Sequence, residues 1–108
     1  MHEVKNNREI ITHTVAFRLI HPAGSKEEAS FLADAKQLLA AIPGVMHFTV
    51  YDQVSGKSDF RFGFAMQFAT GDAHRAYNEH PVHVEFVRER WDAEVAEFQE
   101  LDYVERPL

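Results

Sequence analysis

The chain contains no cysteine, which excludes a disulfide scaffold, a thiolate nucleophile and a metal site built from thiolates. It has no apolar run that approaches the roughly 20 residues needed by a membrane-spanning helix. Its first residues, 1–9, are polar and contain no apolar secretory core, so we expect a soluble, cytoplasmic protein. With 108 residues, of which 45% are hydrophobic, the chain is long enough for one domain with a single core.

Positive charge is also scarce in this chain. It has 11 Lys and Arg residues, scattered along its length, against 17 Asp and Glu residues, and its net charge is −6. Attraction to phosphates dominates non-specific binding to nucleic acids, and an anionic membrane surface attracts a basic helical face. The sequence therefore predicts no nucleic-acid partner and no membrane partner, and it favours small molecules and other protein chains.

Hydrophobic periodicity predicts six elements of secondary structure. Polar and apolar residues alternate, as in β-strands, in four segments: residues 10–20, 45–54, 60–68 and 96–105. A capping box of Ser25 and Glu28 begins one helix, and a second helical region covers residues 70–93. The order βαββαβ predicts an α+β, ferredoxin-like domain, in which a four-stranded antiparallel sheet carries both helices on one face.

The two faces of the predicted sheet differ in composition. The first strand places His13 on the same face as Val15 and Phe17, and the third strand has large apolar residues on one face: Phe60, Phe62, Phe64, Met66 and Phe68. The other face carries small or weakly polar residues: Thr12, Thr14, Ala16, Thr49, Gly63, Ala65 and Gln67. Because a solvated sheet face usually carries charged residues, we expect a second copy of the chain to cover this face in a homodimer.

The most informative local pattern is YNEHPVHV, residues 77–84, where a proline interrupts a helical segment. Pro81 has no N–H and disfavours helical angles at His80, so the helix should break at His80 and restart at Pro81. His80 is then expected to cap the second piece. His83 lies in the new first turn, beside an apolar stripe that includes Trp91.

Three residues are candidates for catalysis: His83, Tyr77 and His13. Imidazole titrates near neutral pH, which suits proton transfer next to a carbonyl, and the helix dipole favours a neutral His83. Tyr77 is suited to donate a hydrogen bond to a developing enolate, and His13 to orient the ligand. Each residue also fits a purely structural role as a hydrogen-bonded core side chain.

The 9 Phe residues leave room for an apolar pocket between sheet and helices. We expect five residues to contact a small apolar or aromatic ligand there: Phe17, Phe62, Phe64, His80 and Trp91. His80 and His83 have a spacing that suits a metal, but the proline break distorts it, and apart from Glu79 and Glu85 no third ligand lies nearby in the sequence. We therefore expect no metal site and no cofactor.

The remaining titratable residues form no recognisable motif. Four acidic residues are expected to lie on a solvated edge: Asp92, Glu94, Glu97 and Glu100. Four histidines are left without an assigned partner: His2, His21, His47 and His74.

Several segments resemble the stress-responsive α/β-barrel (Dabb) domain family: HTVAF at 13–17, IPGV at 42–45, DFRFGF at 59–64, YNEHPVHV at 77–84 and DYV at 102–104. The resemblance covers residues 10–105, after the polar extension of residues 1–9. Its most specific part is the HPxHV block combined with the HxVxF strand. The resemblance implies a ferredoxin-like domain that dimerises through its sheets into an α/β barrel.

The family also includes a plant polyketide cyclase that carries out an aldol condensation without a cofactor. Its catalytic tyrosine and histidine match Tyr77 and His83, and a histidine of its first strand matches His13. Two other residues of its cavity, a histidine and a tyrosine, are replaced here by Phe62 and Ala35. The resemblance to the cyclase therefore does not extend to its substrate.

Three functions remain open from the sequence. The first is a stress-type domain whose homodimer binds a small apolar molecule. The second is a cofactor-free enzyme acting on an oxo-acid, polyketide-like or aromatic substrate, in which His83 abstracts a proton and Tyr77 stabilises the enolate. The third is a monooxygenase of the related dimeric ferredoxin-like type, which the sequence favours least because no context for a haem ligand surrounds its histidines.

Overall fold

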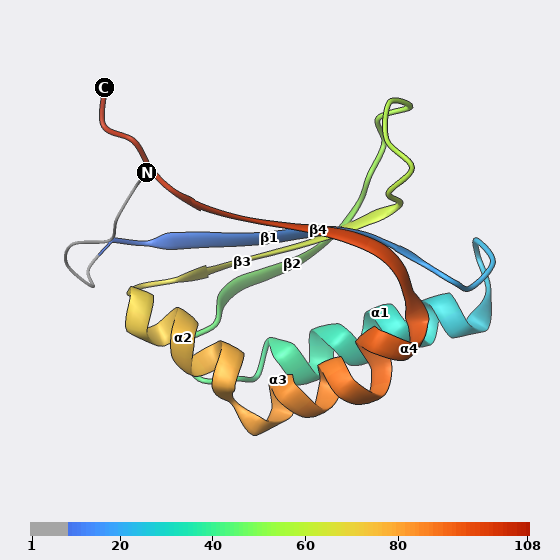
Figure 1. The fold of residues 1–108 in the computed structure, drawn as a ribbon, viewed down its shortest axis with the longest axis horizontal. Coiled ribbons are helices and arrows are strands. Elements are labelled where there is room, and N and C mark those ends of the chain that lie inside the picture. The colour runs from blue at the N-terminus through green and yellow to red at the C-terminus, as the bar shows by residue number, and fades with distance from the viewer. Residues whose placement is uncertain (1–8) are drawn as a thin grey trace.

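In the computed structural model, which describes residues 9–108, a four-stranded antiparallel sheet carries every helix on one side (Figure 1). The strands are β1 (Ile11–Leu19), β2 (Met46–Asp52), β3 (Phe62–Phe68) and β4 (Val95–Val104), in the order β2-β3-β1-β4. The helices are α1 (Lys26–Leu39), α2 (Gly71–Glu79), α3 (Pro81–Phe86) and α4 (Asp92–Glu94), with a π-helical turn, η1 (Val87–Trp91), between α3 and α4. This is the predicted ferredoxin-like order. The predicted extension, residues 1–9, lies outside the described residues except for Glu9.

The faces of the two central strands agree with the sequence pattern. Every second residue of β1, from Ile11 to Leu19, is buried against the helices. In the antiparallel register Phe17 lies opposite Phe62, and His13 lies opposite Met66. The odd residues of β1 and the even residues of β3 therefore share the helix-facing side of the sheet, as predicted. No helix in the described residues is long and apolar enough to cross a membrane.

Aromatic rings fill the space between the sheet and the helices. Phe17 is fully buried, and its ring centroid lies 4.6 Å from that of Phe64 and 5.1 Å from that of Trp91. Phe31 of α1 contacts Phe17 and also Phe86 of α3. These contacts connect β1, β3, α1 and the segment α3–η1 in one core, whose burial is the main source of stability.

The helical region after β3 breaks at the predicted position. α2 begins after Thr70, whose hydroxyl accepts a hydrogen bond from the Ala73 amide, and it ends at Glu79. His80 is extended, with φ −65° and ψ 136°, and its Nδ1 accepts a hydrogen bond from the Val82 amide. His80 therefore caps α3, with Pro81 in the first turn, where its missing N–H costs no hydrogen bond.

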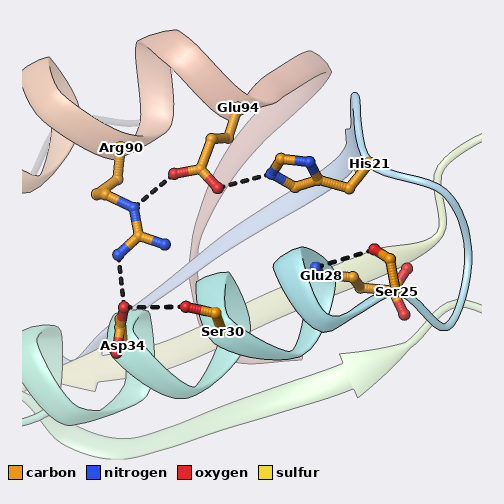
Figure 2. A network of polar contacts seen from close by, with 7 residues as sticks. All are labelled: His21, Ser25, Glu28, Ser30, Asp34, Arg90 and Glu94. Atoms are coloured by element: carbon orange, nitrogen blue, oxygen red, sulfur yellow. Dashed lines mark hydrogen bonds and ion pairs between the residues drawn. The ribbon is translucent and has the colours of Figure 1, made fainter.

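A polar network joins the end of this helical region to α1 and to the turn after β1 (Figure 2). Arg90 donates to Glu94 and to Asp34 of α1, each at 2.5 Å, and His21 contacts Glu94 at 2.7 Å. Burial raises the pKa of Glu94, but hydrogen bonds from Arg90 and His21 outweigh burial, so this pKa lies below its usual value. The expectation that Glu94 lies on a solvated edge is therefore wrong, and His21, which the sequence placed in no motif, belongs to this network.

Replacing Phe64 by Ala should lower the free energy of unfolding by about 3–5 kcal/mol, because the ring is 2% exposed and its removal leaves a cavity in the core. Chemical denaturation measures this loss. Phe98→Ala is the matched control. Its ring is 53% exposed, so its removal should lower the free energy of unfolding by well under half as much. Equal losses at the two positions would mean that the two rings do not differ in burial as described.

Candidate functional site

A cavity of about 380 Å³ lies between the sheet and the helices. It opens where the helices do not cover the sheet completely. β4 is an edge strand, and its residues 96–103 are exposed. The cavity lies between β1, β3 and β4 on one side and the helical region from α2 to α4 on the other, and Val15, Phe64, Trp91 and Phe98 form apolar parts of its lining. Its volume is within the range of small-molecule sites, which begins at about 300 Å³.

His13 is the polar residue at the centre of the sheet side of the cavity. Its side chain is buried, and its Nδ1 donates to Asp102 Oδ1 at 2.5 Å. Its Nε2 lies 3.4 Å from Glu100 Oε2. The register of β4 against β1 explains both contacts, because Asp102 lies opposite His13 and Glu100 lies opposite Val15. A histidine in an apolar face needs such partners, since an unpaired buried polar group is costly.

Tyr77 and His83 lie together on the helix side of the cavity, at ring centroids 4.5 Å apart. Tyr77 is 2% exposed, and burial raises the pKa of its phenol well above the usual value, with Glu100 adding to the effect. The phenol is therefore neutral at physiological pH and able to donate a hydrogen bond.

His83 has the arrangement of a neutral base. Its Nδ1 donates to the backbone carbonyl of Asn78 at 3.1 Å, which leaves Nε2 with a lone pair. Burial lowers the pKa of His83, and the positive form is further disfavoured by His13 and His74, although the Asn78 carbonyl and Glu100 act in the opposite direction. The net effect favours the neutral imidazole at pH 7, as a general base requires.

His74 belongs to the same cavity, although no partner was predicted for it. Its ring stacks on Phe68 at 4.9 Å between centroids and lies 5.0 Å from the ring of His13. Burial lowers the pKa of His74, and its Nε2 is buried without a hydrogen-bond partner among the described residues. In the sequence His74 lies three residues before Tyr77, which places both side chains on one face of a helix. This spacing was the signal that His74 lies near Tyr77.

Only some of the residues expected to bind a ligand line this cavity. Phe64 and Trp91 do, together with the three candidate catalytic residues. Phe17 and Phe62 lie in the core, and His80 caps α3, so these three are not part of the lining. Phe62 does not fill the cavity, and the space beside Tyr77 and His83 stays open.

The lining is acidic, and two residues expected on a solvated edge, Asp92 and Glu100, belong to it while remaining exposed. Asp92, Glu100 and Asp102 line the cavity, and no Lys or Arg of the described residues does. Every second position of β4 is taken by Phe98, Glu100 and Asp102. This period of two was the sequence signal that places the three side chains on one face of the sheet. Carboxylates without a nearby cationic side chain repel anions, so the lining disfavours an oxo-acid and favours a neutral or cationic ligand.

Comparison with known proteins identifies a family and solved structures to which this chain is similar. A family model described as the stress responsive A/B barrel domain (Dabb) matches residues 11–105. A Dabb family protein with a ferredoxin-like fold from Mesorhizobium loti is 52% identical, with a TM-score of 0.91. That match covers 92% of this chain and 99% of the Mesorhizobium chain. A search of curated proteins found no match.

Two more distant structures are similar in fold alone. A hydroxynitrile lyase from Passiflora edulis is 19% identical, with a TM-score of 0.79, and the match covers 94% of this chain and 97% of that one. A dimeric ferredoxin-like protein of unknown function from Thermobifida fusca is 17% identical, with a TM-score of 0.76, and the match covers 97% of this chain and 99% of that one.

The geometry at His83 predicts its tautomer and its titration. In ¹⁵N-labelled protein at pH 7.5, long-range ¹H–¹⁵N correlation spectra should show protonated Nδ1 and unprotonated Nε2, because Nδ1 faces the Asn78 carbonyl. The titration midpoint should lie below the ordinary histidine value of about 6.5, because burial disfavours the charged form. A midpoint above that value, or protonation at Nε2, would contradict the role of neutral base.

Proposed function

Because this chain belongs to the stress-responsive A/B barrel domain (Dabb) family, we propose that it binds a small, neutral carbonyl compound in this cavity and transfers a proton on it without a cofactor. The observation that carries the proposal is the pairing of His83 with Tyr77. A base with a free lone pair and a neutral phenol lie side by side in a cavity with apolar walls.

In the proposed reaction the carbonyl oxygen of the substrate accepts a hydrogen bond from the Tyr77 hydroxyl. His83 Nε2 takes a proton from the carbon next to the carbonyl, the electron pair of that C–H bond moves into the carbonyl, and an enolate forms. The phenol stabilises the negative oxygen, which is typically the largest contribution in such reactions. The protonated His83 then returns a proton to carbon or to oxygen.

The rest of the cavity supports the binding of a neutral, partly aromatic molecule. Trp91 and Phe98 contact each other edge to face at 5.5 Å between centroids, beside Phe64, and offer an apolar surface. On the sheet side, His13 is held between Asp102 and Glu100, which fixes its ring for orienting the ligand. The acidic groups make a substrate without a carboxylate the better match.

Two ketones that differ in charge test this proposal. Phenylacetone and phenylpyruvate both carry a methylene between a ring and a carbonyl, but phenylpyruvate adds a carboxylate. In D₂O the protein should accelerate loss of the methylene signal of phenylacetone in ¹H NMR, and act more weakly on phenylpyruvate. His83→Ala should lower the exchange rate about 10²–10⁴-fold, which is the usual contribution of a general base. Tyr77→Phe should lower it about 10²–10³-fold, as loss of one hydrogen-bond donor to the developing oxyanion does.

Matched controls separate this chemistry from general damage. His21→Ala removes an imidazole outside the cavity, and Tyr51→Phe removes an exposed hydroxyl on the other face of the sheet, so both should keep the wild-type rate. Exchange that survives His83→Ala would overturn the assigned base. Saturable thermal stabilisation by phenylacetone without any exchange would also overturn proton transfer, and would leave a ligand-binding protein.

We also infer that the open face of the sheet is the interface of a homodimer. Three large side chains on this face are exposed by about half, namely Tyr51 at 54%, Leu101 at 46% and Tyr103 at 54%. They surround the small residues of the central strands, since Leu101 pairs with Thr14 and Tyr51 with Gly63. Exposed apolar surface of this kind marks an interaction site, and the relative from Thermobifida fusca is described as dimeric.

Leu101→Glu should convert the dimer into a monomer, because the substitution places an unpaired charge within the proposed interface. Light scattering at micromolar concentration measures the mass. Val84→Glu is the matched control, because Val84 is 50% exposed but lies on α3, on the opposite side of the sheet. A monomeric wild type, or equal loss of dimer in both variants, would refute this interface.

A further inference from the structure

Two imidazoles and a carboxylate from three different elements converge beside the cavity. His13 comes from β1, His74 from α2 and Asp102 from β4. One potential metal-binding atom of each lies within 4.8 Å of the other two. All three residues line the cavity, so the space between them is reached from the same side as the proposed substrate site.

His74 presents a buried ring nitrogen that the protein itself does not satisfy. Its Nε2 has no hydrogen-bond partner among the described residues. Leaving a buried polar atom unpaired is costly, so a native structure usually provides a partner. A metal ion is one such partner, since a neutral imidazole nitrogen is the commonest metal ligand in proteins.

One ring nitrogen of His13 already lies near a carboxylate, as the nitrogen that does not bind the ion does in a metal-bound histidine. While its Nδ1 faces Asp102, its Nε2 lies 3.4 Å from the Glu100 carboxylate. In metal sites the ring nitrogen that does not bind the ion usually donates to a carboxylate, which fixes the ring and raises its basicity. Glu100 is placed to accept that proton, and it is a separate residue from the three ligands.

Only a modest rearrangement separates this cluster from a bound site. Ligands at about 2.0–2.2 Å from a tetrahedral ion lie about 3.3 Å from each other. His13 Nδ1 and Asp102 Oδ1 are 2.5 Å apart and must separate to admit an ion. One ring nitrogen of His74 lies within 4.8 Å of the candidate ligand atoms of both residues, so a small shift completes the set. The Asp102 side chain is 42% exposed on the edge strand, so it is free to move.

We propose that His13, His74 and Asp102 bind a divalent transition-metal ion, with Zn²⁺ as the best match, and that a fourth position faces the cavity. Two nitrogen ligands and one carboxylate favour Zn²⁺, Co²⁺ or Ni²⁺ over Mg²⁺ and Ca²⁺, which prefer oxygen. Three protein ligands with an open position are typical of zinc sites that bind a further molecule. This inference does not depend on proton transfer by His83.

Metal binding to the intact protein tests the proposal. Protein treated with EDTA and then dialysed should take up one Zn²⁺ per chain in a calorimetric titration, and elemental analysis after dialysis should find the same ratio. Zn²⁺ should also raise the melting temperature, because an ion that binds only the native state stabilises it. Co²⁺ in the same site should give the visible absorption of a four-coordinate ion.

Variants decide which residues hold the ion. His74→Ala and Asp102→Asn should each weaken Zn²⁺ binding at least about tenfold, since even residues behind the ligands contribute 10–100-fold. Both positions are partly exposed, so the variants should fold, and circular dichroism checks this. His83→Ala is the control, because it removes another cavity imidazole that is not a ligand, and it should keep wild-type affinity while losing any ketone exchange.

Three results would overturn the metal site. One is a wild-type protein that takes up no stoichiometric Zn²⁺. Another is uptake that His74→Ala leaves unchanged, which would place the ion elsewhere on the chain. The last is equal affinity for Mg²⁺ and Zn²⁺, because a site with two imidazole ligands discriminates strongly between these ions. Failure of ketone exchange with retained Zn²⁺ uptake would reject only the proposed reaction.

Discussion

The break in the helical region at His80 and Pro81 is the constraint on which the site depends. A proline removes one backbone donor and prevents helical angles in the residue before it. The His80 ring supplies the missing cap, and α3 begins in a new frame after α2 has ended. Because the two helices do not continue one another, the side chain of His83 at the start of α3 turns back to Tyr77 near the end of α2. The Asn78 carbonyl near the end of α2 then fixes the ring of His83.

Polar residues in the apolar layer between sheet and helices follow a common rule: each is paired or faces the cavity. His13 has carboxylates on both ring nitrogens, and Tyr77 lies against the rings of His13 and His83. Such groups are costly unless they are hydrogen-bonded, and a low local dielectric makes each contact stronger. The imidazoles, the carboxylates and the aromatic rings therefore line one cavity together. A ligand in it meets both polar and apolar contacts.

The sequence predicted the fold well because its strongest patterns are local. Alternation in β1 and β3 identified their buried faces, and proline chemistry located the break and the cap. It did not identify the acidic lining, because Glu100 and Asp102 on an edge strand have the same pattern as solvated residues until their register with His13 is known. The spacing of three residues places His74 and Tyr77 on one face of α2, but no short-range pattern specifies how α2 crosses the sheet and so brings that face to His13. Phe17 and Phe62 look the same in the sequence as Phe64, and only packing separates the core from the cavity.

The π-helical turn η1 has a consequence for how such a cavity changes during evolution. A π-turn contains one residue more than an α-helical turn over the same length, and it arises or disappears by a single-codon insertion or deletion. Trp91 at the end of η1 and Asp92 directly after it both line the cavity. Because the π-turn accommodates its additional residue locally, loss of that residue would return the turn to α-helical geometry and leave α4 and β4 in place. One short indel, far from β1 and β3 in the sequence, would thus change which side chains next to Trp91 and Asp92 face the cavity while the core strands stayed the same.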